Sequence, residues 1–144
     1  KVGFVRSVIN RVKNQSAAMK KIPSIIFAEG DSVKVLRAVN QIVEEGFASP
    51  ILVGNPDKIK RVSREKGLDN IENVKIIDHL EDPKAEVYAK TMFDLRHRRG
   101  VMFPEAKHLM RDSNFFAAMA VHLGDADAMI TGSDSKYADA VKPI

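Results

Sequence analysis

Residues 124–144, GDADAMITGSDSKYADAVKPI, contain the stretch that decides the fold. Gly124 is typical of the end of a helix, and residues 128–130 are a short apolar run of the buried-strand type. The polar, glycine-containing turn that follows, residues 131–135, leads into a second helix that begins near Tyr137. A loop that leaves the carboxyl end of a parallel strand and enters a helix is where open α/β sheets bind ligands.

This turn has the groups needed to bind an anion. Backbone N–H groups at the start of the second helix, together with the hydroxyls of Thr131, Ser133 and Ser135, are donors suited to a phosphate or carboxylate. The same residues also fit a hydroxyl-capped turn that binds nothing. The pattern alone leaves both interpretations open.

Composition is ordinary for a globular protein and excludes several classes of function. The 144 residues are 44% hydrophobic and 29% charged, with a net charge of +4. Most basic residues are interleaved with acidic ones, so we expect no nucleic-acid partner. No apolar run approaches the roughly 20 residues of a membrane span, so we expect no membrane partner either. The absence of cysteine rules out disulfides and a cysteine nucleophile, and it fits the cytoplasm.

Strands alternate with helices along the chain. Apolar runs predict strands near residues 24–28, 50–54, 74–77 and 127–131, and helices with caps and terminal glycines separate them. This order predicts a three-layer α/β/α fold with a mainly parallel sheet of about four strands and right-handed crossovers. The helix at residues 114–123 is apolar nearly all round, so we expect it to be buried.

Two charged stretches have both a structural and a functional interpretation. In the turn at residues 28–31, Glu29 and Asp31 would repel a phosphate, so we interpret it as a helix cap formed by Asp31 or Ser32. The basic run at residues 96–99 complements the negative end of a helix dipole, with an anionic ligand or partner as the alternative.

Motifs for dinucleotide binding, a P-loop and a nucleophile elbow are absent. Asp125-Ala126-Asp127 resembles a metal-binding D-x-D, but carboxylates in this position usually belong to loops. The four histidines have no metal-ligand spacing. We therefore assign no catalytic residue and no metal ligand in this chain.

Several segments together resemble the phosphate acetyl/butyryl transferase family, over about residues 20–144. They occur in the family's order and are IIFAEGD at 25–31, VLRA at 35–38, PILVG at 50–54, RG at 99–100, NFFAAM at 114–119, GDADA at 124–128 and VKP at 141–143. The resemblance implies the first half of a phosphotransacetylase-like fold. It also implies an acyl-CoA or phosphate as small-molecule ligand.

The turn after Gly132 discriminates between two forms of the family. Free-standing phosphate acetyltransferases carry a His-Ser/Thr-Thr cluster and then Arg-Pro there, whereas this chain has Ser135-Lys136-Tyr137 and Lys142. A lysine keeps the charge of the family arginine but loses its planar, bidentate fork. The pattern is more similar to the domain fused to multidomain NADP-dependent malic enzymes, which convert malate to pyruvate and CO2 with NADP and a divalent metal held in another domain.

The resemblance implies that such a fused domain binds acetyl-CoA for regulation and supports a homo-oligomer. Its candidate ligand-binding residues in this chain are Thr131, Gly132, Ser133, Ser135, Tyr137 and Lys142. An active phosphate acetyltransferase, with acetyl-CoA as substrate, and a structural assembly module without ligand are the alternatives.

We expect the chain to be part of a longer protein, because it begins at Lys1 without methionine and stops just inside a predicted helix. Residues 1–20 are then a linker helix from an upstream domain, on the basis of a weak helical apolar pattern over residues 4–19. Residues 21–144 are the N-terminal part of the phosphotransacetylase-like domain.

Overall fold

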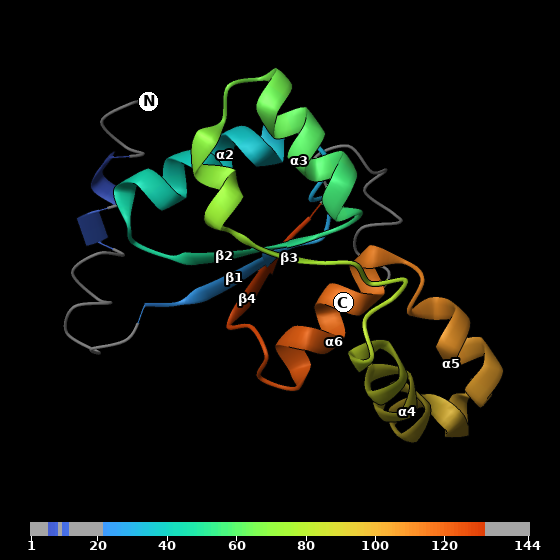
Figure 1. Ribbon diagram of the computed structural model, residues 1–144. Coiled ribbons are helices and arrows are strands. Elements are labelled where there is room, and N and C mark those ends of the chain that lie inside the picture. Colours follow the sequence, from blue (N-terminus) through green and yellow to red (C-terminus); the bar gives the residue numbers. More distant parts are fainter. Residues whose placement is uncertain (1–5, 9, 12–21, 132–144) are drawn as a thin grey trace.

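A four-stranded parallel sheet forms the centre of the protein, seen here in a computed structural model that describes residues 6–8, 10–11 and 22–131 (Figure 1). The strands are β1 (Ser24–Phe27), β2 (Ser49–Val53), β3 (Lys75–Ile77) and β4 (Ala128–Ile130). Their order is β3-β2-β1-β4, and each neighbouring pair is parallel. The predicted parallel sheet of four strands is confirmed.

Strand β1 is paired on both sides. Ile26 lies opposite Ile51 of β2 and Met129 of β4, and Phe27 lies opposite Leu52 and Ile130. Side chains along β1 alternate between the faces: Ile26 belongs to one buried cluster and Phe27 to the other. Both faces of the sheet therefore have to be covered by helices.

One face is covered by α2 (Val33–Glu45), α3 (Pro56–Glu65) and the 3-10 helix η1 (Asp69–Asn73). The cluster on this side joins Phe27 and Leu52 of the sheet to Leu36, Ile59 and Ile71 of the helices. The 3-10 helix was not predicted from the sequence. Its five residues are too short for a helical apolar pattern, although the buried Ile71 anchors it.

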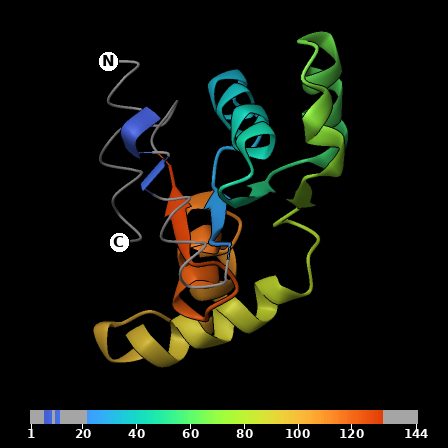
Figure 2. The same ribbon diagram turned by 90° about the vertical axis from the view of Figure 1, so that its left-hand side faces the viewer.

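The other face is covered by α4 (Lys84–Arg96), the short 3-10 helix η2 (His97–Arg99), α5 (Phe103–Leu109) and α6 (Ser113–His122). Figure 2 shows these helices and the α2–α3 pair on opposite sides of the sheet. Helix α6 lies against β1, β4 and α4, and six of its ten residues are buried, including Phe115 and Phe116. The prediction that this helix is among the most buried elements is confirmed.

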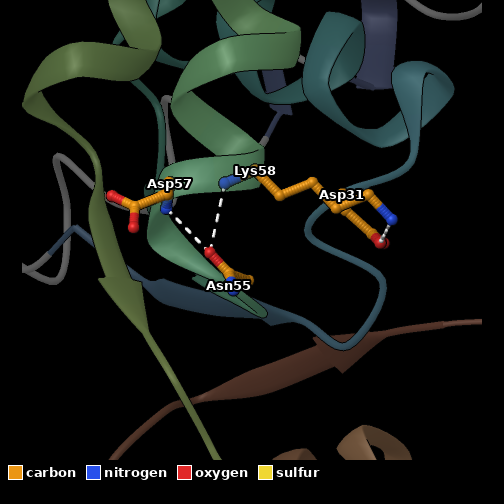
Figure 3. Close-up of polar contacts among 4 residues, drawn as sticks. All are labelled: Asp31, Asn55, Asp57 and Lys58. Carbon is orange, nitrogen blue, oxygen red and sulfur yellow. Dashed lines mark hydrogen bonds and ion pairs between the residues drawn. The ribbon is translucent and has the colours of Figure 1, made fainter.

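Side-chain caps begin α3 and α6 but not α2. Asn55 caps α3 through its side chain, with Pro56 in the first turn, and Asp112 caps α6. At α2 the cap residue is Ser32, as predicted, but its hydroxyl makes no cap hydrogen bond. The Ser32 hydroxyl is buried and has no hydrogen-bond partner among the described residues. Asp31, the other predicted cap, instead pairs with Lys58 at 2.8 Å (Figure 3).

Gly30 allows the loop after β1 to approach β2. Its N–H donates to the carbonyl oxygen of Val53 at 3.0 Å. A Cβ at this position would lie 2.6 Å from that oxygen, closer than a real contact allows. The resemblance segment at residues 25–31 therefore contains a glycine that packing requires.

Residues 6–8 and 10–11 are helical, in agreement with the helix predicted over residues 4–19. Arg6 forms an ion pair with Glu45, at the end of α2, with an N–O distance of 3.0 Å. Among the described residues no helix is both long and apolar enough to cross a membrane.

The two cap positions give a matched test of stability. The Asn55 side chain accepts hydrogen bonds from the N–H groups of Asp57 and Lys58 at 2.9 and 3.1 Å (Figure 3). We expect Asn55→Ala to lower the free energy of unfolding by about 1 kcal/mol, as loss of a helix cap does. Ser32→Ala removes a buried hydroxyl without a partner and should leave stability unchanged or slightly higher. Chemical denaturation of both variants measures the difference, and equal losses would contradict this account of the caps.

Candidate functional site

The carboxyl ends of β1 and β4 meet at the point where the direction of the chain reverses across the sheet. From β1 the chain proceeds outward through β2 and β3, and it then returns to β4 on the other side of β1. The loops that follow β1 and β4 therefore begin side by side, and the N–H of Ala28 donates to the carbonyl oxygen of Ile130 at 3.1 Å. In open α/β sheets such a point opens the crevice where ligands bind.

Thr131, the one predicted ligand-binding residue among the described residues, follows β4 at this point. Its hydroxyl donates a short hydrogen bond to Oδ1 of Asn114, in the first turn of α6. Asn114 is buried, so this contact ties the end of β4 to the start of α6. The other predicted ligand-binding residues, Gly132, Ser133, Ser135, Tyr137 and Lys142, lie outside the described residues. Their role stays a prediction.

A pocket of about 470 Å³ lies between α4, α6 and β4. Its polar side chains are Arg96, near the end of α4, and His122, at the end of α6. The remaining lining is apolar: Met92, Leu95, Ala118, Met119, Val121 and Met129. A concave apolar site with few polar groups is the usual form of a small-molecule site.

Met129 of the pocket and Thr131 lie on the same face of β4. Met129 lines the pocket, and Thr131 follows two residues later, so both side chains leave the strand on the side of α6. Two residues of extended chain span about 6–7 Å. The α6 residues of the pocket, from Ala118 to His122, lie about one to two helical turns beyond Asn114, so the pocket extends from Met129 away from Thr131.

The basic residues at the end of α4 make two different kinds of contact. His97 Nδ1 lies 3.1 Å from the carbonyl oxygen of Phe93 and 3.2 Å from that of Asp94, so it caps the helix as predicted. Arg96 instead lines the pocket. The sequence signal for this difference was available: Arg96 follows the buried Met92 by four residues and extends the apolar face of α4.

A polar cluster holds α4 against the loop between α6 and β4. The hydroxyl of Tyr88 donates to Oδ2 of Asp125 at 2.5 Å, and Nζ of Lys84 lies 3.1 Å from Oδ1 of the same carboxylate. Burial of the ring, and then the hydrogen bond to Asp125, raise the pKa of Tyr88 above its ordinary value of 10.0. The hydrogen bond from Tyr88 lowers the pKa of the Asp125 carboxyl.

The Asp125-Ala126-Asp127 segment makes structural contacts on both sides. Asp125 accepts from Tyr88, and Oδ2 of Asp127 accepts from the N–H of Ser24 at 2.8 Å. Within residues 22–131 and the described part of the N-terminal helix, no group of three or more residues has a metal-binding arrangement.

Comparison with known proteins identifies relatives along nearly the whole chain. The family model for phosphate acetyl/butaryl transferase matches residues 4–144. A phosphate acetyltransferase from Corynebacterium glutamicum is 34% identical over 119 residues, which are 83% of this chain and 36% of that protein. An NAD-dependent malic enzyme from Rhizobium meliloti is 35% identical over 123 residues, 83% of this chain and 16% of the enzyme. The chain thus spans about a third, or less, of these two relatives.

Solved structures share the fold. The EutD phosphotransacetylase from Staphylococcus aureus superimposes with a TM-score of 0.84 at 23% identity, covering 96% of this chain and 41% of that one. A phosphotransacetylase from Streptococcus pyogenes has a TM-score of 0.83 at 25% identity, with the same coverage. The expected first half of a phosphotransacetylase-like fold is confirmed.

The raised pKa of Tyr88 predicts a loss of stability in alkali. Tyrosine in the unfolded chain ionises near pH 10.0, whereas Tyr88 in the folded protein keeps its proton to higher pH. The hydroxyl therefore contributes its full stability below pH 10, and this contribution falls as the pH rises further. We expect the free energy of unfolding to fall more steeply above pH 10 in the unsubstituted protein than in Tyr88→Phe. Parallel profiles in denaturant titrations would contradict this assignment.

Proposed function

Because the chain belongs to the phosphate acetyl/butyryl transferase family, we propose that it is the N-terminal part of an acetyl-CoA-binding domain in a multidomain malic enzyme. The proposal that the domain binds acetyl-CoA rests on the pocket between α4, α6 and β4, which is lined by Arg96 and by mostly apolar side chains. In this proposal acetyl-CoA regulates the parent enzyme, and the domain supports a homo-oligomer.

The chemistry of the pocket suits an acyl-CoA. Such a molecule combines an acyl and pantetheine chain of low polarity with phosphate groups. Thioether side chains such as Met92, Met119 and Met129 adapt to an irregular apolar ligand. The guanidinium of Arg96 is planar and always charged, and it matches a phosphate with two parallel hydrogen bonds.

The proposal that the parent protein is a malic enzyme rests on the sequence. Ser135-Lys136-Tyr137 and Lys142 depart from the free-standing transferases in the turn after Gly132. A malic enzyme at 35% identity supports this choice. That relative is named NAD-dependent, whereas the resemblance implies NADP, so the nicotinamide specificity of the parent belongs to the proposal. The oxidation and decarboxylation of malate, and its divalent metal, would belong to another domain of the parent.

An active phosphate acetyltransferase is the second candidate. The phosphate acetyltransferases from Corynebacterium glutamicum and Clostridium acetobutylicum are 34% and 35% identical, as similar as the malic enzyme. An assay on the full-length protein separates the two candidates. Malate-dependent reduction of NADP or NAD, modulated by acetyl-CoA and without acetyl transfer between acetyl phosphate and coenzyme A, supports the proposal. Rapid acetyl transfer without malate oxidation favours the second candidate.

Substitution of Arg96 tests the ligand site. We expect Arg96→Ala to raise the dissociation constant of acetyl-CoA, measured by calorimetry on the full-length protein, by about 10- to 100-fold. This range corresponds to the roughly 1.5–3 kcal/mol of a hydrogen bond to a charged group. Arg96→Lys should fall between, because lysine keeps the charge without the bidentate fork.

Arg98 provides the matched control. It lies two residues further along, in η2, is exposed and does not line the pocket. Arg98→Ala should leave the dissociation constant within about twofold, since surface charge pairs contribute little. Equal losses for the Arg96→Ala and Arg98→Ala variants would mean that general charge, and not the pocket, binds acetyl-CoA.

Lys142 provides an independent test of the predicted turn. If the turn after Gly132 contacts the anionic part of the effector, Lys142→Ala should raise the acetyl-CoA concentration needed for half-maximal effect on malic-enzyme activity by on the order of tenfold. Activity without acetyl-CoA should stay nearly unchanged. A dose–response curve identical to that of the unsubstituted protein would remove Lys142 from the site.

A further inference from the structure

Helix α4 presents one stripe of residues to both the core and the pocket. Tyr88, Met92 and Arg96 follow one another at intervals of four, so they lie on one face of the helix. Tyr88 and Met92 are buried, whereas Arg96 is partly exposed and lines the pocket. Any rotation of α4 about its axis turns all three side chains together.

Tyr88 is the residue of this stripe with a directed polar contact. Its ring packs against that of Phe116 in α6, with 4.9 Å between the ring centroids. Its hydroxyl donates to Oδ2 of Asp125 at 2.5 Å, and this contact limits rotation of α4 further because hydrogen bonds weaken steeply with angle.

Asp125 is itself fixed to the rest of the fold. Its N–H donates to the carbonyl oxygen of Ala120, in α6, at 2.8 Å. Two residues later, the N–H of Asp127 donates to the carbonyl oxygen of Ser24 at 2.9 Å, and the Asp127 carboxylate accepts from the Ser24 N–H. The segment between α6 and β4 is thus held at both ends, to a helix and to the sheet.

We propose that Tyr88 is a positioning residue for the acetyl-CoA pocket: its hydrogen bond to Asp125 fixes the rotation of α4 and thereby directs Arg96 into the pocket. This inference rests on the proposed function. The three walls of the pocket belong to α4, α6 and β4, and the Tyr88–Asp125 contact joins α4 to the segment between the other two. Recognition of a ligand requires side chains held to within about 10–20° of the productive geometry, by packing together with supporting hydrogen bonds.

Lys84 contributes less than Tyr88 to holding Asp125. Its ammonium contacts the second oxygen of Asp125, but the Lys84 side chain is 52% exposed and that of Asp125 is 37% exposed. Ion pairs at such exposure contribute little because water screens them. The buried hydroxyl of Tyr88 therefore dominates the cluster.

A double-mutant cycle on the full-length protein tests the proposal. Tyr88→Phe keeps the ring and removes the hydroxyl, and we expect it to raise the dissociation constant of acetyl-CoA by on the order of fivefold, the equivalent of one net hydrogen bond. In the Arg96→Ala background the same change should have less than about a twofold effect, since there is no guanidinium left to direct. Thr91→Ala, which removes a hydroxyl bonded within α4 itself, is the control and should leave the affinity unchanged.

A second pair of variants keeps the test decisive if Tyr88→Phe does not fold. Asp125→Asn retains an oxygen that accepts from Tyr88 and should bind acetyl-CoA nearly as well as the unsubstituted protein. Asp125→Ala should weaken binding as Tyr88→Phe does. Equal affinities for the two Asp125 variants would overturn the proposal.

The outcomes separate the inference from the function on which it rests. Equal losses from Tyr88→Phe in both backgrounds, or no loss in either, overturn the positioning role while acetyl-CoA binding stands. If the unsubstituted full-length protein does not bind acetyl-CoA at all, the proposed function falls and the inference falls with it.

Discussion

The hydrogen-bond ladders on both sides of β1 are the constraint on which the rest of the structure depends. A central parallel strand is buried on both faces, so Ile26 and Phe27 each need a covering layer of helices. Parallel neighbours cannot be joined by tight turns, and each connection must therefore cross a face of the sheet. The crossover that returns the chain from β3 to β4 contains α4, α5 and α6, and it is this crossover that creates the pocket.

Local signals allowed most of the fold to be predicted. Apolar runs located all four strands to within about two residues, and Asn55-Pro56 and Asp112 are residue types that favour the helix starts found there. Two features of the fold were not predicted correctly, and both are short local structures. Ser32 is the cap residue of α2, but its hydroxyl is buried and makes no capping hydrogen bond. The 3-10 helix η1 has too few residues to show a period.

The site was harder to predict, because its residues come from distant parts of the chain. Thr131 was chosen by a general rule about strand ends, and its role in ligand binding stays a prediction. Arg96 and His122 meet in the pocket only after α4 and α6 have packed together, and no spacing in the sequence relates them. The contact between Tyr88 and Asp125, 37 residues apart, has the same origin.

We propose that the layer formed by α4, α5 and α6, and not the layer formed by α2 and α3, binds acetyl-CoA. Hydrogen–deuterium exchange on the full-length protein, with and without acetyl-CoA, tests this most directly because it maps protection along the backbone. The account predicts slower exchange near the ends of α4 and α6 and along β4, with α2 and α3 unchanged. Protection confined to α2 and α3, or no protection at saturating acetyl-CoA, would contradict it.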